Sequence, residues 1–419
     1  MAQTPGIDRR ADFGLSHAAC SAEQRRFAVS PPALPAVGVL PHASFDPVWG
    51  GVDFNTRHRA DRGGLTRAHI TKPTLPAPAG AAESRGCPPQ GDMAMLSDAE
   101  TGAALAAMQA HDGSSELRLL LIGATGNVGQ HCLTKLLEDA AESGEPVKLL
   151  VATRDPEGFW AAYRHPRRCP AVVEPVKCDA GDPGSLAAVI AATAPTRVFI
   201  SMAQALSPEA MVACGQACVD ACAAAGVSRL VRLSSLGIDK PPGQGPLGDA
   251  HLTIETHAAE KAPALPVVSV RPTSFHTNLL AYDADSIRTE SCFRSPLGSD
   301  AKVNWVHCKD TGSVCAVALG KPDGDAAVQP VIDVTGPPES TLGAADMAAL
   351  LSEELGRPIV YEEVAPLPFP GLEALWGFLK AGGFDASSDS VEQLTGKPPM
   401  DFRAIVNEAK PQLSPPADL

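Results

Sequence analysis

The chain has 419 residues, of which 44% are hydrophobic and 20% are charged, a composition typical of a globular protein with two or three domains. Its formal net charge of −14 argues against a nucleic-acid partner, because contacts with phosphates need clustered Lys and Arg. No apolar run approaches the roughly 18 to 20 residues of a membrane span. The 11 cysteines include no C-x-x-C pair, which fits a reducing compartment. We therefore expect a soluble, cytoplasmic protein that acts on a small molecule, and its oligomeric state stays open.

The first part of the chain, residues 1–95, is rich in proline and has no lasting apolar period. Such a segment cannot bury enough apolar surface to fold, so we expect a disordered extension. Its Ala, Ser and Arg content also fits a transit segment for an organelle, a plastid or mitochondrion, although acidic residues come early, at Asp8, Asp12 and Glu23. Both interpretations stay open.

Ordered structure is expected to begin with a helix after residue 95. Ser97 and Glu100 have the spacing of a capping box, and Asp112-Gly113 ends the apolar pattern that follows them. The first strand is expected over 119–122, where four aliphatic residues in a row suit a strand buried on both faces of a parallel sheet.

Three glycines follow this strand with the spacing G-x-x-G-x-x-G, at Gly123, Gly126 and Gly129. An apolar stripe over 130–142 predicts a helix directly after them, and a second strand over 147–152 completes a β-α-β unit of about 30 residues. A strand that turns sharply on glycine into a helix leaves backbone N–H groups free to bind a pyrophosphate. We therefore expect this loop to bind a dinucleotide through Gly123, Thr125, Gly126, Asn127, Val128 and Gly129.

The residue at the end of the second strand indicates which nicotinamide cofactor binds. An acidic residue there would bind the ribose hydroxyls of NAD, whereas an Arg would accommodate the 2′-phosphate of NADP. The chain has Arg154 first and Asp155 directly behind it. This order favours NADP(H) over NAD(H), although Arg154 also fits a solvated surface loop.

Strands and helices then alternate, which predicts an α/β fold with a doubly wound parallel sheet of the Rossmann type over residues 96–280. The expected strands lie at 171–176, 198–200, 230–233 and 267–270 and the expected helices at 183–190, 208–225 and 251–261. In such sheets the ligand lies off the carboxyl ends of the strands. The further candidate cofactor contacts at these ends are Asp179, Ala180, Ser201, Ser234 and Pro272.

A different pattern follows Pro272 and predicts a smaller α+β substrate domain over 281–410 that covers the nucleotide. Two short strands and a helix are expected in it, at 304–307, 331–334 and 344–355. Trp376 and Phe378 lie on a further expected helix and fit an apolar substrate cleft or plain core packing equally well. Residues 411–419 are expected to form a tail.

Cys214, Cys218 and Cys222 are spaced four apart, so they share one face of an expected helix. No histidine accompanies them, and the helix is otherwise small and apolar. We interpret them as thiols packed against the sheet and expect no metal site.

The ordered series of motifs at the strand ends resembles the NmrA-like family of atypical short-chain dehydrogenases/reductases. The resemblance covers roughly residues 117 to 408 and leaves the N-terminal extension out. The matching segments are GATGNVG at 123–129, TRDP at 153–156, DAGDP at 179–183, GVSRLVRLSSLG at 226–237, IE at 254–255, RPTSF at 271–275 with Asn278, WVH at 305–307 with Asp310, DVTG at 333–336 and TGKPP at 395–399.

The resemblance implies that the glycine loop and Arg154 bind the phosphates of NADP, with Asp179 and Ala180 beside the adenine and Ser201 beside the nicotinamide half. The family includes NADPH-dependent quinone reductases, isoflavone-reductase-like enzymes and non-catalytic redox sensors. These implied positions agree with the strand ends derived from the residues alone.

The chain departs from its relatives in acid–base chemistry. Conventional short-chain dehydrogenases use Tyr-x-x-x-Lys, in which Lys lowers the pKa of the Tyr, but Tyr163, Tyr282 and Tyr361 all lack a Lys four residues later. The isoflavone-reductase branch places a Lys about eight residues before the Glu of its Ile-Glu pair, and Leu247 occupies that position here.

His251 and His276 lie near expected strand ends and are the candidate catalytic proton donors. We expect an NADP(H)-dependent oxidoreductase that transfers hydride to a quinone-like or conjugated carbonyl acceptor, with the proton supplied by solvent or a single His. A non-catalytic NADP(H)-binding redox sensor or regulator, and a scaffold that uses the fold alone, remain as alternatives.

Overall fold

The computed structural model describes residues 117–162, 171–202, 206–366 and 371–415. The extension expected over 1–95 and the helix expected from residue 97 lie outside these residues. No helix within the described ranges is long and apolar enough to cross a membrane.

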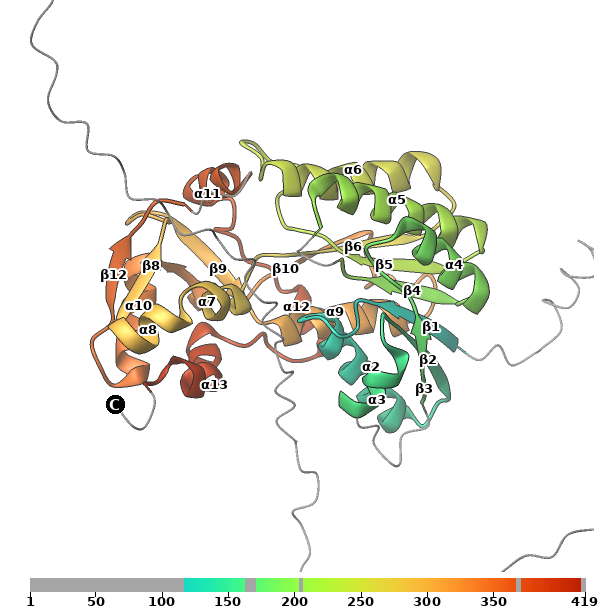
Figure 1. The fold of residues 1–419 in the computed structure, drawn as a ribbon, viewed down its shortest axis with the longest axis horizontal. Helices are drawn as coiled ribbons and strands as arrows, with labels where there is room; N and C mark the ends of the chain where they lie inside the picture. The colour runs from blue at the N-terminus through green and yellow to red at the C-terminus, as the bar shows by residue number, and fades with distance from the viewer. Residues whose placement is uncertain (1–116, 163–170, 203–205, 367–370, 416–419) are drawn as a thin grey trace, which may run out of the picture. The chain divides into compact units, whose positions relative to one another are not determined.

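A seven-stranded parallel sheet forms the centre of the fold, with the strand order β10-β6-β5-β4-β1-β2-β3 (Figure 1). Its strands are β1 (Leu117–Ile122), β2 (Val147–Thr153), β3 (Val172–Lys177), β4 (Arg197–Ile200), β5 (Arg229–Leu233), β6 (Val267–Pro272) and β10 (Val331–Val334). The order reverses at β1, as in doubly wound folds that bind nucleotides at this point. The sheet confirms the predicted fold class.

Helices cover both faces of this sheet, which explains the unbroken aliphatic run of β1. Leu119 and Leu121 point into one core cluster and Leu120 and Ile122 into the other, and all four are fully buried. In Figure 1, α4 (Pro183–Thr193), α5 (Pro208–Ala224) and α6 (Pro246–Lys261) lie on one face, and α2 (Gly129–Ser143), α3 (Pro156–Ala162) and α9 (Cys308–Gly320) lie on the other. The predicted helices are therefore present, and α6 begins earlier than expected, at Pro246.

A second region is built around its own apolar cluster, which includes Phe293, Met347 and Phe402. Its strands form a three-stranded sheet, β11-β9-β7, and a two-stranded sheet, β12-β8. The elements are β7 (Ser274–Phe275), α7 (His276–Tyr282), α8 (Ala284–Glu290), β8 (Cys292–Ser295), β9 (Lys302–Val306), a 3-10 turn η1 (Pro338–Ser340), β11 (Thr341–Gly343), α10 (Ala344–Leu355), β12 (Val360–Glu363), α11 (Leu372–Lys380) and α13 (Phe402–Leu413).

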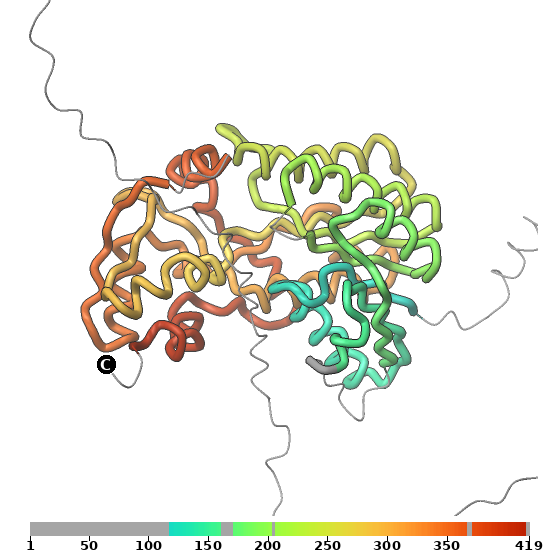
Figure 2. The backbone as a smooth tube through the Cα atoms, in the orientation of Figure 1, coloured from blue at the N-terminus to red at the C-terminus, as the bar shows by residue number. Residues whose placement is uncertain are grey.

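The domain boundary predicted at residue 280 stays a prediction, and residues on both sides of it contribute to the main sheet. After β9 the chain returns to the main sheet, where α9 packs on α2 and β10 pairs with β6 (Figure 2). A further helix, α12 (Ser390–Thr395), adds Val391 to the core on the α2 side. Helix α13 continues to Leu413, which is fully buried, so the expected tail boundary at 411 falls inside a helix.

Two buried arginines hold α9 against the amino edge of the sheet. Arg197 and Arg229 begin β4 and β5 and are paired in register. Their guanidinium groups donate to the carbonyls of Ala318, Leu319, Lys321 and Pro322 at the end of α9, at 2.6–2.9 Å. Both also reach Asp323, at 3.0 and 3.1 Å. The arginines thus satisfy the carbonyls that a helix leaves free at its C-terminus.

Replacing Arg229 with Met should lower the free energy of unfolding by about 2–4 kcal/mol, because the buried Ala318 carbonyl and the part-buried Pro322 carbonyl then lose this donor and Arg197 is left to bind the end of α9 alone. Denaturant unfolding measures the loss. Asp323→Asn is the matched control: this carboxylate is half exposed, so its loss should cost less than about 1 kcal/mol. Equal losses in the two variants would contradict the assignment.

Candidate functional site

The glycine loop after β1 is a tight turn in which each glycine has a different role. Gly123 has φ +84°, and a Cβ there would lie 2.2 Å from the Ser201 carbonyl oxygen. A Cβ on Gly129 would lie 2.0 Å from the Gly123 oxygen, whereas one on Gly126 would meet only that oxygen, at 3.3 Å. Gly123 and Gly129 are therefore required by the fold, and Gly126 leaves its outer side open.

Among the described residues, the amides of Asn127, Val128 and Gly129 at the entry to α2 have no hydrogen-bond partner and are available to an anion. Those of Gln130 and His131 instead donate to the Gly126 and Val128 carbonyls, at 3.0 and 3.1 Å. No described side chain caps this helix, and its described first turn has no acidic residue. Free N–H groups at a helix N-terminus bind phosphates. Thr125, Gly126 and Asn127 are exposed beside these amides. The side chain of Val128 is buried in the core, so only its main chain could face a ligand.

The carboxyl ends of the neighbouring strands bring further predicted residues to the same edge. Arg154 follows β2 and is exposed. Asp179 follows β3, is exposed, and accepts a hydrogen bond from the Gly181 amide at 3.0 Å, while Ala180 beside it is half-buried. Ser201 follows β4, and its amide donates to the Ile122 carbonyl at 3.0 Å, next to the glycine turn.

Ser234 and Pro272 end β5 and β6 at this edge, but both are buried. The Ser234 hydroxyl donates to Glu255 Oε1 at 2.6 Å, so this hydroxyl already has a protein partner. The amide of Leu236 donates to the Pro272 carbonyl at 3.0 Å, which ties the two strand ends together. Their roles as cofactor contacts remain predictions.

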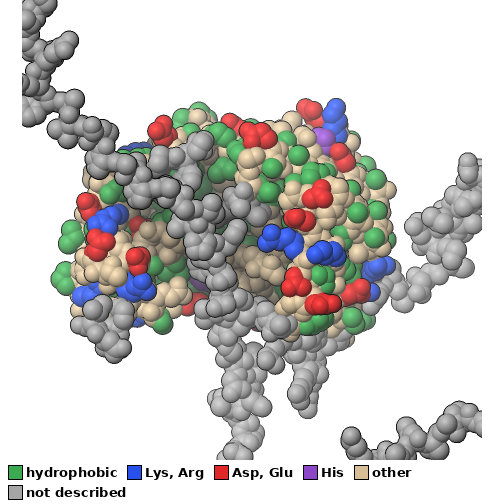
Figure 3. Space-filling model, in the orientation of Figure 1, with side chains coloured by type: hydrophobic (Ala, Val, Ile, Leu, Met, Phe, Trp, Pro, Cys, Tyr) green, Lys and Arg blue, Asp and Glu red, His purple; other side chains and the backbone are tan. Residues whose placement is uncertain are grey.

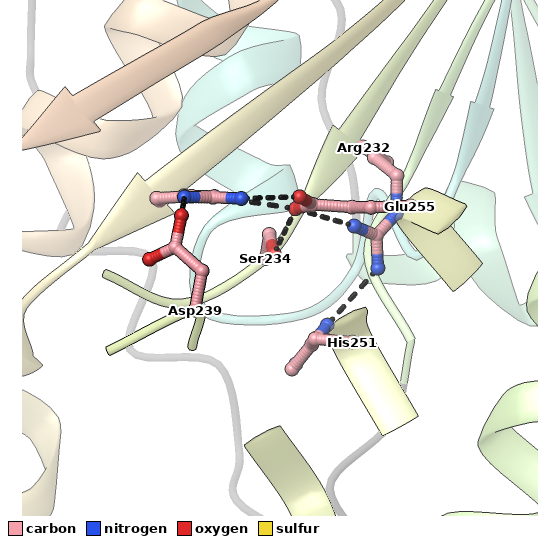
Figure 4. A network of polar contacts seen from close by, with 6 residues as sticks. Arg232, Ser234, Asp239, His251 and Glu255 are labelled. Atoms are coloured by element: carbon pink, nitrogen blue, oxygen red, sulfur yellow. Dashed lines mark hydrogen bonds and ion pairs between the residues drawn. The ribbon is translucent and has the colours of Figure 1, made fainter. Parts of the chain in front are cut away.

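A polar network lies behind these strand ends (Figure 4). The Glu255 carboxylate on α6 forms ion pairs with Arg232 of β5 at 3.0 Å and with Arg271 of β6 at 2.5 Å. Arg271 also donates to Asp239 in the loop after β5, at 2.9 Å. Burial alone would raise the pKa of Glu255, but the bonds from Arg271 and Ser234 and the charge of Arg232 outweigh it and hold the pKa below its usual value. The network fixes the loop after β5 to the ends of β5 and β6.

Arg232 also fixes the state of His251. Its Nη2 lies 3.0 Å from His251 Nδ1, and because a guanidinium only donates, Nδ1 accepts and the ring proton sits on Nε2. Burial, with the charge of Arg232, lowers the pKa of His251 to about 3. His251 is therefore neutral at pH 7.

His276 lies apart from His251, in a cluster of three imidazoles. Its ring stacks on that of His307, with centroids 3.9 Å apart, and His131 of α2 lies 5.8 Å from His307. Burial lowers the pKa of His276 and of His131 to about 4 and that of His307 to about 2. The structure thus does not bring the two predicted catalytic histidines together, and both are uncharged at neutral pH.

Sequence reasoning missed the partners of these histidines. Arg232 and Glu255 belong to the family motifs but had no role assigned to them. An Arg within a buried strand needs an acidic partner, so the Glu of the following helix could have been predicted as that partner. His131 carried no signal and His307 stood in the WVH motif without an assigned role, because only the packing of α2 against α9 brings the two rings together.

No cluster of His, Cys, Asp or Glu that could hold a metal ion exists among the residues the structure describes. Cys214, Cys218 and Cys222 are buried in the core between α5 and the sheet. Their placement supports the packing interpretation.

Comparisons with known sequences identify relatives. A family model described as NAD(P)H-binding matches residues 123–277. The (4-alkanoyl-5-oxo-2,5-dihydrofuran-3-yl)methyl phosphate reductase of Streptomyces griseus is 30% identical over 301 residues, which is 68% of this chain and 95% of the relative. Festuclavine synthase I of Penicillium roqueforti is 26% identical over 211 residues, 46% of this chain and 68% of the relative.

Solved structures share the fold. Triphenylmethane reductase of Citrobacter sp., complexed with NADP(H), superposes with a TM-score of 0.57 at 18% identity and covers 70% of this chain and 99% of its own. An NADPH-dependent quinone oxidoreductase from Escherichia coli, complexed with NADPH, gives 0.55 at 19% identity, with coverage of 69% and 99%. At these identities the likeness establishes the fold alone.

Gly126→Val should abolish dinucleotide binding while the protein stays folded, because the added side chain would occupy the space in front of the α2 amides. Calorimetric titration with NADPH measures the loss, and circular dichroism checks the fold. Gly129→Ala is the contrasting variant: its Cβ would meet the Gly123 oxygen, so stability itself should fall. Undiminished affinity in Gly126→Val would exclude this loop as the phosphate site.

Stability should fall as the pH drops from about 7 towards 4. An unfolded His has a pKa of about 6.5, and the folded pKa values of His131 and His276 lie near 4, so the unfolded chain binds more protons in this window. His307→Asn keeps the bond that His307 accepts from the Lys309 amide at the start of α9 but removes one titrating group. Its melting temperature should therefore depend less steeply on pH than that of the wild type; parallel curves would refute the interpretation.

Proposed function

Because the chain belongs to the NmrA-like, NAD(P)H-binding reductase family of atypical short-chain dehydrogenases/reductases, we propose that it is an NADPH-dependent reductase acting on a conjugated carbonyl or quinone-like acceptor. The observation that carries the proposal is the glycine turn, which leaves Gly126 open in front of the uncapped start of α2. This cradle fits a pyrophosphate, and Gly126 adds no side chain to it.

The exposed Arg154 supports NADP(H) rather than NAD(H), and two structures of the same fold were solved with NADPH or NADP(H). The name of the Streptomyces relative supports the acceptor class. The dihydrofuran ring in that name carries a C=C bond conjugated with carbonyl groups.

When bound, the nicotinamide supplies a hydride, and the protein has to position the acceptor and balance the charge. The low pKa values of His251 and His276 mean that neither imidazole carries an extra proton to donate at pH 7. A neutral imidazole N–H can still hydrogen-bond a carbonyl oxygen and polarise it. The balancing proton then comes from solvent, which agrees with the lack of a Tyr-x-x-x-Lys sequence.

The test is turnover of NADPH by the purified protein with a panel of quinones and acyl-substituted unsaturated lactones, followed by loss of NADPH absorbance. Acceptor-dependent oxidation well above background is expected. Tight NADPH binding without oxidation of any acceptor would instead favour a redox sensor. The two low pKa values are the observation that keeps this alternative open.

The same assay separates the two histidines. If one of them polarises the acceptor, its replacement by Asn should lower kcat about 10- to 100-fold with little change in the Kd for NADPH. His257→Asn is the control, since His257 on α6 pairs with Asp220 on α5 at 2.8 Å in an exposed contact between these two helices. Unchanged kcat in both His251→Asn and His276→Asn would show that neither imidazole polarises the acceptor.

A further inference from the structure

A second cation stands beside Arg154 at the edge of the candidate cofactor site. Lys177 is the last residue of β3 and is exposed. It is paired in register with Thr153, the last residue of β2, and the Cys178 amide continues the ladder by donating to the Thr153 carbonyl at 2.9 Å. The Lys177 ammonium donates to the backbone carbonyl of Arg154. Neighbouring strands lie about 4.8 Å apart, so two long basic side chains start from adjacent strand ends at this edge.

Neither cation has an acidic partner among the described residues. No described carboxylate forms an ion pair with Arg154 or Lys177, although the chain carries a net charge of −14. On the same strand pair, Lys148 of β2 forms an ion pair with Glu174 of β3 at 2.7 Å. Acidic and basic side chains of the described residues are likewise intermixed on the face drawn in Figure 3. Two adjacent unpaired cations repel each other, and an anion bound between them would offset that repulsion.

The acidic residues that follow Arg154 and Lys177 in the chain, Asp155 and Asp179, have other partners. Asp155 accepts a bond from the Gly158 amide at 2.9 Å, and a Cβ on Gly158 would lie 2.1 Å from Asp155 Oδ2. Its carboxylate is thus packed on the first turn of α3. The carboxylate of Asp179 accepts from the Gly181 amide. The acid that would bind the ribose hydroxyls of NAD is therefore engaged elsewhere.

We propose that Lys177 is a specificity-determining residue that binds the 2′-phosphate of NADP(H) together with Arg154. This inference rests on the proposed NADP(H) site and adds a ligand from β3 to the Arg at the end of β2. A phosphate monoester carries nearly two negative charges at pH 7, so one guanidinium and one ammonium match it in charge. Discrimination against NAD(H) then depends on two residues, Arg154 after β2 and Lys177 at the end of β3, rather than on Arg154 alone.

The probe is 2′,5′-ADP, which carries the adenosine half with its 2′-phosphate, compared with 5′-AMP, which lacks that phosphate. Calorimetric titration of the full chain measures both. Lys177→Met should weaken 2′,5′-ADP binding about tenfold or more, as loss of a charge-assisted bond does, and leave 5′-AMP binding unchanged. Its affinity for 2′,5′-ADP should also depend less steeply on salt concentration.

Lys148→Met is the matched control, because it removes a Lys from the same strand pair whose charge is already neutralised by Glu174. It should leave both affinities as in the wild type. Arg154→Met tests the proposed cofactor choice separately and should also weaken 2′,5′-ADP binding.

Three results are decisive. If Lys177→Met binds 2′,5′-ADP like the wild type while Arg154→Met does not, the inference fails and the NADP(H) site stands. If Lys177→Met loses 2′,5′-ADP and 5′-AMP equally, Lys177 supports the adenosine pocket and not the phosphate. If the wild type binds neither probe and no NADPH, the proposed function and the inference fail together.

Discussion

The fold of the candidate cofactor site depends on a main-chain contact between Gly123 and Gly129. Any side chain atom at position 129 would overlap the Gly123 oxygen, and one at 123 would overlap the Ser201 oxygen. The turn can therefore be this tight only because β1, its turn and the start of α2 touch through backbone. That closeness places the start of α2 directly after the carboxyl end of β1, where the amides of Val128 and Gly129 have no partner among the described residues and could bind a phosphate. The helix in turn provides the surface on which α9 packs.

Helix α9 links the two regions of the molecule. At its start, Gly312 lies so close to α2 that a Cβ would be 2.6 Å from the Cβ of His131. At its end, Arg197 and Arg229 hold its last carbonyls. Both ends of α9 are thus held against the Rossmann-type layers. The strand that follows, β10, completes the main sheet beyond β6. Motion of the second region relative to the glycine turn would have to break these buried contacts.

Burial, as well as the identity of the residues, decides which side chains at the site are charged. Around Glu255, two arginines outweigh the cost of burying a carboxylate, so its pKa is held low. Around His251 and His276, no carboxylate outweighs burial, so both rings stay neutral. At the opposite end of the site, Arg154 and Lys177 are exposed and keep their charge free for a ligand. The same chain therefore presents positive charge where phosphates would bind and uncharged donors at the candidate histidines.

The sequence by itself determined the sheet, the glycine turn and the family, because these depend on local patterns: the aliphatic run of β1, three spaced glycines and motifs at successive strand ends. It also placed Arg154 and Asp179 correctly at one edge, since parallel strands share their carboxyl ends. Only the tertiary structure decided that β10 returns to the main sheet, that Ser234 is bound to Glu255, and that His251 and His276 lie in separate clusters. These outcomes depend on contacts between residues far apart in the chain, whose side-chain directions and burial no local pattern encodes.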